Sequence, residues 1–156
     1  MTEKTAHDEV EGEKLKITKI FNTGIENVFE AWVNSEEITE WYGPANMTVD
    51  LREMDAIEGG VFRMTMKGDD GSTHPLRGKY RVIDPPNKII MTWQWENPDA
   101  SGEKPKETLV TVDFRILDED RTELTLTHEG LKDAEDVKKH KEGWEGSFSK
   151  LEEISE

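Results

Sequence analysis

Four histidines are the side chains in this sequence best suited to acid–base or metal chemistry: His7, His74, His128 and His140. None lies at metal-ligand spacing from a second histidine or a carboxylate on one predicted element, so we expect no metal site and no cofactor. The sequence has no cysteine, which excludes thiolate catalysis, disulfides and iron–sulfur clusters. Each histidine must therefore be judged singly, by the element on which it lies.

Other arrangements that could do chemistry fail on geometry. His128 and Glu129 are adjacent, so on a strand their side chains point to opposite faces. Ser147 lies in Trp-Glu-Gly-Ser-Phe, which does not match the Gly-x-Ser-x-Gly nucleophile elbow. Gly59-Gly60 and Gly68 to Gly71 are typical of hairpin turns and not of a phosphate-binding loop, because no helix follows them. The sequence thus predicts no dedicated catalytic site.

His128 belongs to a series of predicted strands in which apolar and polar side chains alternate. The predicted strands are residues 15–21, 47–54, 61–67, 74–83, 88–96, 107–117 and 122–128. Turn sequences such as Gly68-Asp69-Asp70-Gly71 separate them, which predicts an antiparallel meander. From the third strand onward each has one apolar face, formed in residues 107–117 by Val110, Val112, Phe114 and Ile116. Such a sheet needs a layer on one side.

Two short helices are predicted after the first strand. Apolar residues three and four positions apart predict the first over residues 25–33. The second is expected to have Ser35 as its N-cap, with Glu36 and Glu37 at the positive end of its dipole. It should end at Gly43-Pro44, because proline cannot continue a helix.

A long amphipathic helix is predicted over residues 133–156. Its apolar stripe consists of Val137, Trp144, Phe148, Leu151 and Ile154. Trp144 and Phe148 are expected to be its buried anchors. Gly143 and Gly146 each cost about 1 kcal/mol of helix propensity, which favours a close approach by a neighbour, for which the sheet backbone is the expected candidate.

These elements predict an α+β fold, in which a curved antiparallel sheet of about six or seven strands wraps around the long C-terminal helix. The length of 156 residues fits a single domain. Residues 1–12 are polar and acidic, so we expect a disordered N-terminal tail there and one domain over residues 13–156.

The charge of the chain limits its partners. Asp and Glu outnumber Lys and Arg by 35 to 20, which gives a net charge of −15 and argues against a nucleic-acid partner. A solvated acidic surface and adaptation to a salty cytoplasm both explain this excess. No apolar run approaches the roughly 20 residues of a membrane span. Residues 1–14 lack the apolar core of a signal peptide, so a cytoplasmic location is expected.

The covered face of the sheet is rich in aromatic residues and methionine, which either fill a core or line an adaptable pocket. If they line a pocket, His128 and Tyr80 would supply polar contacts to a bound ligand. The candidate ligand-binding residues are Trp32, Phe62, Met64, Met66, Tyr80, Trp93, Trp95, His128 and Trp144.

Several segments, in the right order, resemble proteins similar to the activator of the heat-shock protein 90 ATPase. The resemblance covers roughly residues 14–154. The matching segments are Val28-Phe29-Glu30-Ala31-Trp32, Trp41-Tyr42-Gly43-Pro44, Gly59-Gly60-Val61-Phe62, Asp84-Pro85-Pro86-Asn87-Lys88, Thr92-Trp93-Gln94-Trp95, residues 107–112, residues 126–131 and residues 140–148.

This resemblance implies a START-like, helix-grip fold with a hydrophobic cavity between the sheet and the last helix. The leading hypothesis is a binding protein for a small hydrophobic or amphipathic molecule. An alternative is a chaperone-interacting module, although the larger relatives with that role carry an additional N-terminal domain for which this chain has no room. A third is a cyclase-like enzyme, in which His128 would be the general base and its ring would have to open into the cavity.

Overall fold

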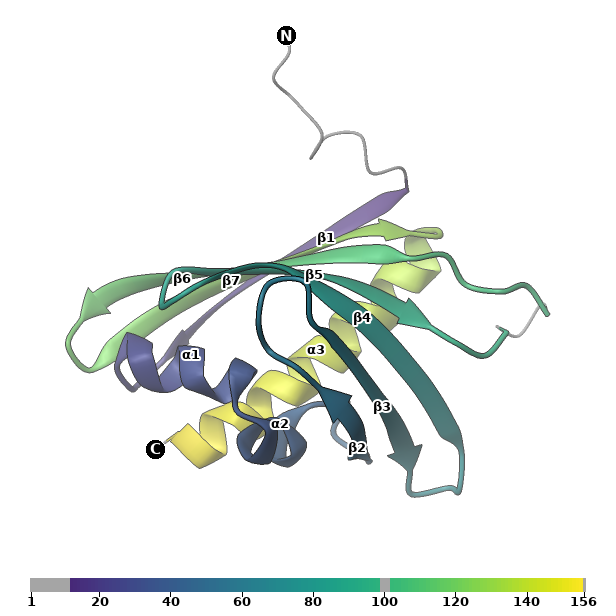
Figure 1. Ribbon diagram of the computed structural model, residues 1–156, viewed down its shortest axis with the longest axis horizontal. Coiled ribbons are helices and arrows are strands. Elements are labelled where there is room, and N and C mark those ends of the chain that lie inside the picture. The colour runs from purple at the N-terminus through teal and green to yellow at the C-terminus, as the bar shows by residue number, and fades with distance from the viewer. Residues whose placement is uncertain (1–11, 99–101, 156) are drawn as a thin grey trace, which may run out of the picture.

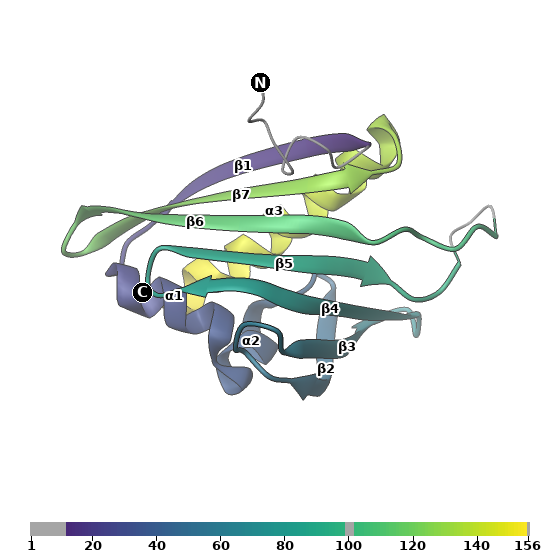
Figure 2. The same cartoon turned by 45° about the horizontal axis from the view of Figure 1, so that its top comes forward.

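The computed structural model describes residues 12–98 and 102–155. Within these residues seven antiparallel strands form one sheet in the order β1-β7-β6-β5-β4-β3-β2, and three helices lie on one side of it (Figures 1 and 2). The elements in chain order are β1 (Glu13–Phe21), α1 (Ile25–Val33), α2 (Ser35–Trp41), β2 (Met47–Met54), β3 (Val61–Gly68), β4 (Thr73–Asp84), β5 (Lys88–Trp95), β6 (Thr108–Asp118), β7 (Arg121–Leu131) and α3 (Ala134–Ser155). This architecture confirms the predicted helix-grip fold.

The sheet arches over α3, which runs across its concave side (Figure 1). On the same side, α1 lies near β6 and β7, and α2 lies beside β2. β1 pairs with β7, so the first and last strands of the chain are neighbours. Trp144 and Phe148 of α3 are buried, as predicted, and pack against Trp32 of α1 with ring centroids 5.8 and 6.3 Å away. The helices and the sheet therefore share one aromatic core.

The cap of α2 lies one residue earlier than predicted. Asn34 is the N-cap, and its Oδ1 accepts hydrogen bonds from the backbone N–H groups of Glu36 (2.9 Å) and Glu37 (3.0 Å). Ser35 is instead the first helical residue. Both residue types cap helices well, so composition could not choose between adjacent positions. The same residue, Asn34, also ends α1, which explains why the two helices join so tightly.

The two glycines of α3 meet a loop and not the sheet backbone, which corrects the prediction. A Cβ on Gly146 would lie 2.7 Å from the backbone N of Ala45, and one on Gly143 would lie 3.5 Å from Cγ of Pro44. Lys150, one turn further along α3, donates to the carbonyl oxygens of Pro44 (3.1 Å) and Met47 (3.0 Å). The loop between α2 and β2 is thus held directly against α3.

The alternation of faces predicted for β6 holds until the strand leaves the core. Val110, Val112 and Phe114 are buried, but Ile116 is 60% exposed. The pairing of β6 with β7 shifts register between Ile116 and Asp118, near the hairpin tip, where no helix covers the sheet. Ile154, near the end of α3, is likewise 43% exposed. The prediction was wrong for these two residues.

The predicted disordered tail lies outside the described residues, except for Gly12. No helix in residues 12–98 or 102–155 is long and apolar enough to cross a membrane.

Candidate functional site

A cavity of about 1000 Å³ opens between the sheet and the first half of α3. Its inner wall contains the indole rings of Trp93 and Trp95 from β5 and of Trp144 from α3. Met66 of β3 and Leu131 of β7 add apolar surface. Charged residues of the connection between β5 and β6 and of the start of α3 form its rim. The cavity therefore joins an aromatic interior to a polar mouth.

The cavity contacts some of the residues predicted from the sequence and not others. Met66, Trp93, Trp95 and Trp144 lie in its wall. The remaining candidates are fully buried and do not line it: Trp32, Phe62, Met64, Tyr80 and His128. Trp32 packs between α2 and α3, and Phe62 packs against Tyr80 with ring centroids 5.4 Å apart. In this structure those five residues support the walls from behind.

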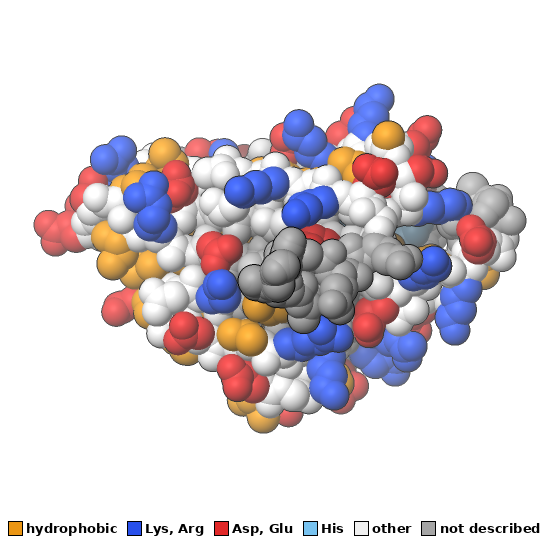
Figure 3. Space-filling view, turned by 90° about the horizontal axis from the view of Figure 1, so that it is seen from above, with side chains coloured by type: hydrophobic (Ala, Val, Ile, Leu, Met, Phe, Trp, Pro, Cys, Tyr) orange, Lys and Arg blue, Asp and Glu red, His pale blue; other side chains and the backbone are white. Residues whose placement is uncertain are grey.

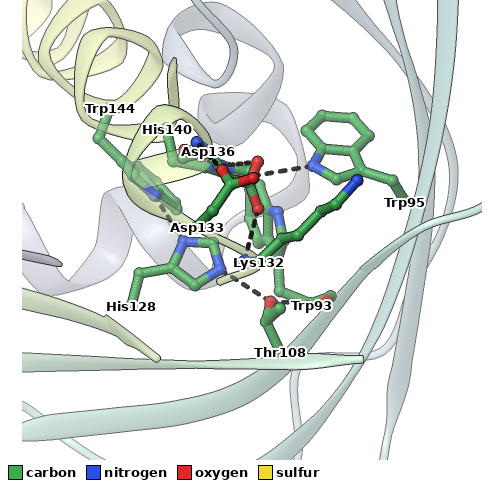
Figure 4. A network of polar contacts seen from close by, with 9 residues as sticks. All are labelled: Trp93, Trp95, Thr108, His128, Lys132, Asp133, Asp136, His140 and Trp144. Carbon is green, nitrogen blue, oxygen red and sulfur yellow. Dashed lines mark hydrogen bonds and ion pairs between the residues drawn. The ribbon is translucent and has the colours of Figure 1, made fainter. Parts of the chain in front are cut away.

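His128 lies in a chain of hydrogen bonds that ties α3 to the sheet (Figure 4). Nε1–H of Trp144 donates to Nδ1 of His128 (3.1 Å). The hydroxyl of Thr108 donates to the carbonyl oxygen of Trp93 (2.7 Å), so it accepts the hydrogen of Nε2 of His128 (2.8 Å). These partners assign His128 as the neutral tautomer protonated on Nε2.

This arrangement is not that of a general base. Both ring nitrogens of His128 are engaged by protein groups, and the residue has no exposed surface. Burial lowers the pKa of His128 well below its usual value, and the neighbouring His140 lowers it further. The condition that the cyclase hypothesis sets, a ring open to the cavity, is not met. His128 instead supports the wall that carries Trp93 and Trp144.

A second polar cluster, beside the first, was missed in the sequence. His140 of α3 lies in the cavity wall, with its ring centroid 5.0 Å from that of His128. Nε1–H of Trp95 donates to Nε2 of His140 (3.1 Å), so Nδ1–H of His140 points to Asp136, 2.9 Å from its carbonyl oxygen and 3.2 Å from Oδ1 (Figure 4). Asp136 and His140 are four residues apart on one helix, a spacing that should have drawn attention to them.

Asp136 is the anchor of this second cluster. Its Oδ2 accepts a hydrogen bond from the backbone N–H of Lys132 (3.0 Å), and its own N–H donates to Oδ1 of Asp133 (2.9 Å). The hydrogen bond from His140 is the main reason why the pKa of Asp136 falls to about 2. Asp136 therefore stays ionised and fixes the ring of His140, which in turn orients Trp95.

Two of the three tryptophans in the cavity wall donate their indole N–H to a histidine. Trp144 donates to His128, and Trp95 donates to His140. Trp93 differs, since its Nε1–H is buried and has no hydrogen-bond partner among the described residues. An unpaired buried donor costs roughly 1–3 kcal/mol. Trp93 lies in the cavity wall, but this N–H has almost no exposed surface there.

The described residues form no cluster of three or more histidine, aspartate or glutamate side chains that could hold a metal ion. His128 and His140 are neighbours, but the groups described above already occupy their nitrogens. What the site can do chemically is bind, because it offers aromatic surface and a charged rim.

The fold is shared by solved bacterial proteins at low sequence identity. A protein from Chromobacterium violaceum is 22% identical, with a TM-score of 0.82, over 91% of this chain and 96% of its own. The AHSA1 protein from Silicibacter pomeroyi is 23% identical, with a TM-score of 0.79, over 91% and 96% of the two chains. A protein from Staphylococcus epidermidis is 19% identical, with a TM-score of 0.74, over 94% and 93%. These identities show the fold alone.

A comparison with curated protein sequences found no match. A protein family does match, and it covers residues 22–156, which include α1, α2, the strands β2 to β7 and α3. The family is described as activator of Hsp90 ATPase homolog 1-like protein. The match also includes every residue of the two histidine clusters. This chain belongs to that family.

Proposed function

We propose that this protein binds a small amphipathic molecule in the cavity between the sheet and α3. The observation that carries the proposal is the cavity itself, about 1000 Å³ with three tryptophan rings in its wall. Small-molecule sites usually measure roughly 300–1,000 Å³ and combine apolar walls with a few polar groups. The cavity is at the upper end of this range, large enough for an extended or ring-containing ligand.

The hydrogen bonds behind the wall support the proposal. His128 and His140 each accept from an indole N–H, which fixes the rings of Trp144 and Trp95 in orientation. Fixed side chains lose little conformational entropy when a ligand binds, so the affinity is greater for the same contact area. In a site with no evident catalytic group, such preorganisation favours recognition over chemistry.

Native mass spectrometry of protein purified from its own cells tests the proposal most directly. We expect a retained small molecule, or otherwise a thermal shift with members of a panel of lipids and aromatic metabolites. A ligand-free spectrum together with no thermal shift across the panel would contradict the proposal.

A matched pair of variants locates the site. Gly143 lines the cavity, and a Cβ there would meet only Cγ of Pro44 at 3.5 Å, so Gly143→Leu should place a side chain at the wall without unfolding α3. Binding is expected to weaken at least about tenfold, because the added volume takes the place of ligand. Glu145→Leu adds the same side chain at an exposed position of α3 that does not line the cavity and should leave binding unchanged.

A chaperone partner is a separate proposal that rests on family membership. A pull-down with the heat-shock protein 90 of the same organism and an ATPase assay test it, and an unchanged ATPase rate would rule out an activator role. Cytoplasmic location stays a prediction of the sequence.

A further inference from the structure

The charges around the cavity differ in sign from those of the whole chain. The whole sequence contains 35 acidic and 20 basic residues. The described residues that line the cavity include four lysines, Lys104, Lys106, Lys132 and Lys139, against three carboxylates. Blue side chains also gather at the end of the molecule where the connection from β5 to β6 lies, on the right in Figure 3. The mouth is therefore a locally basic part of an acidic protein.

The carboxylates at the mouth are largely engaged. Glu103 pairs with Lys132 (3.4 Å). Asp136 accepts from the backbone N–H of Lys132 (3.0 Å) and is ion-paired with His140 (3.2 Å) if that ring is protonated. Glu107 is exposed on the connection that leads into β6. Two of the three carboxylates, Glu103 and Asp136, thus have partners within the protein.

Three of the lysines have no such partner. No ion pair or hydrogen bond joins the ammonium group of Lys104, Lys106 or Lys139 to any described residue. Lys104 and Lys106 come from the connection between β5 and β6, whereas Lys139 comes from α3. These ammonium groups therefore border the same mouth from two separate segments.

From this arrangement we infer that the ligand is an anionic amphiphile, with a carboxylate or similar headgroup at the lysines and an apolar body along the tryptophans. The inference rests on the proposed binding function and specifies its ligand class. Lys104, Lys106 and Lys139 supply the positive charge, and Trp93, Trp95 and Trp144 supply the apolar contact.

The net charge of −15 makes the inference unusually easy to test. The long-range field of the protein attracts cations and repels anions. If charge at the mouth had no effect, a cationic amphiphile would bind at least as well as an anionic one of the same length. A preference for the anion can arise only from local groups, and it should shrink as salt shortens the Debye length below about 10 Å.

Three probes with the same twelve-carbon chain separate the possibilities: dodecanoate, dodecanol and dodecylammonium, each below its aggregation concentration. Binding is followed by tryptophan fluorescence, since three tryptophans line the cavity. We expect dodecanoate to bind roughly five- to twentyfold more tightly than dodecanol, from a few solvent-screened ion pairs, and dodecylammonium to bind most weakly. Equal affinities, or a preference for the cation, would overturn the inference and leave the proposed function intact. Failure of all three to bind would overturn the inference, whereas the proposed function is decided by the mass spectrum and the thermal-shift panel.

Lysine variants identify the groups responsible. The triple variant Lys104→Gln, Lys106→Gln and Lys139→Gln should lose most of the preference for dodecanoate and keep its affinity for dodecanol. The control variant Lys16→Gln, Lys79→Gln and Lys141→Gln changes the net charge equally at exposed positions outside the cavity lining, and should keep the preference. If both variants lose it to the same extent, the overall field explains the preference and the inference fails.

Discussion

The indole N–H of Trp144 donates a hydrogen bond to Nδ1 of His128 over 3.1 Å, and both side chains are buried. Trp144 belongs to α3 and His128 to β7, so the bond joins the helix to the sheet that surrounds it. Trp144 lines the cavity, whereas His128 lies behind its wall. Stability and the shape of the cavity consequently depend on the same pair.

Replacing Trp144 tests this pair. Trp144→Phe keeps most of the ring but leaves Nδ1 of His128 without a donor, which should cost about 1–3 kcal/mol of the free energy of unfolding. Trp144→Ala also removes the packing against Trp32 and Phe148 and should cost about 3–5 kcal/mol. Urea denaturation measures both values.

A double-mutant cycle isolates the hydrogen bond from the packing. The costs of Trp144→Phe and His128→Gln should be coupled by more than about 0.5 kcal/mol, because the two side chains are in contact. Additive costs would show that the bond contributes nothing to stability.

His128 should also make stability depend on pH. An unfolded histidine titrates near pH 6.5, whereas burial lowers the pKa of His128 well below that value in the folded protein. Between these two pKa values the unfolded chain binds more protons, so the stabilisation is complete above about pH 6.5 and is lost progressively as the pH falls. The slope is at most about 1.4 kcal/mol per pH unit. Urea titrations between pH 5 and 7.5 should show it.

The matched variants for this slope are His128→Gln and His74→Gln. The first keeps hydrogen-bonding groups but removes the titration, so most of the slope should disappear even if overall stability falls. The second changes a histidine outside this network and should retain the slope. The ionised Asp136, whose pKa falls to about 2, does not titrate in this range. A slope that survives His128→Gln would assign the effect to another group.

The fold could be predicted from the sequence because its signals are local. Alternation along residues 61–67 and 88–96, the turn at Gly68 to Gly71 and the stripe with Trp144 and Phe148 each depend on neighbours within a few positions. These signals specify strands, hairpins and one covering helix. The exposure of Ile116 could not be predicted from such signals. Whether a strand extends beyond the layer that covers it depends on the lengths of elements far apart in the chain.

The site was less predictable for the same physical reason. Inward-facing residues could be identified from alternation, but not which of them face a cavity and which pack against one another. Tyr80 and Trp93 both point to the covered side, yet only Trp93 lines the cavity. The link of His140 to Trp95 could not be predicted, because it joins residues 45 positions apart, although the spacing of His140 from Asp136 was visible in the sequence. Lys104 and Lys106 come from a connection with no regular pattern.

The cap of α2 gives a third prediction, from adjacent residues. Asn34→Ala removes the acceptor of two backbone N–H groups and should cost about 0.5–2 kcal/mol. Ser35→Ala lies within the helix and should change stability by less than about 0.5 kcal/mol. Thermal or urea unfolding of both variants decides between the two positions. A larger loss of stability for Ser35→Ala than for Asn34→Ala would show that Ser35 is the N-cap.

The two glycines of α3 should respond to alanine with opposite signs. Gly143→Ala adds a Cβ at an ordinary distance from Pro44, 3.5 Å, and gains the helix propensity of alanine, so it should stabilise the protein by about 0.5–1 kcal/mol. Gly146→Ala gains the same propensity, but its Cβ would lie 2.7 Å from the backbone N of Ala45. A backbone atom cannot rotate away as a side chain can.

For Gly146→Ala, the loop that contains Ala45 or α3 itself must move, and Lys150 resists this by holding the carbonyl oxygens of Pro44 and Met47. Overpacking of this kind costs roughly 1–3 kcal/mol, more than the propensity returns. Gly146→Ala should therefore lower the free energy of unfolding, while Gly143→Ala raises it. Urea unfolding of the two variants side by side gives the sign of each. Stabilisation by both would mean that the loop between α2 and β2 packs less closely on α3 than the structure shows.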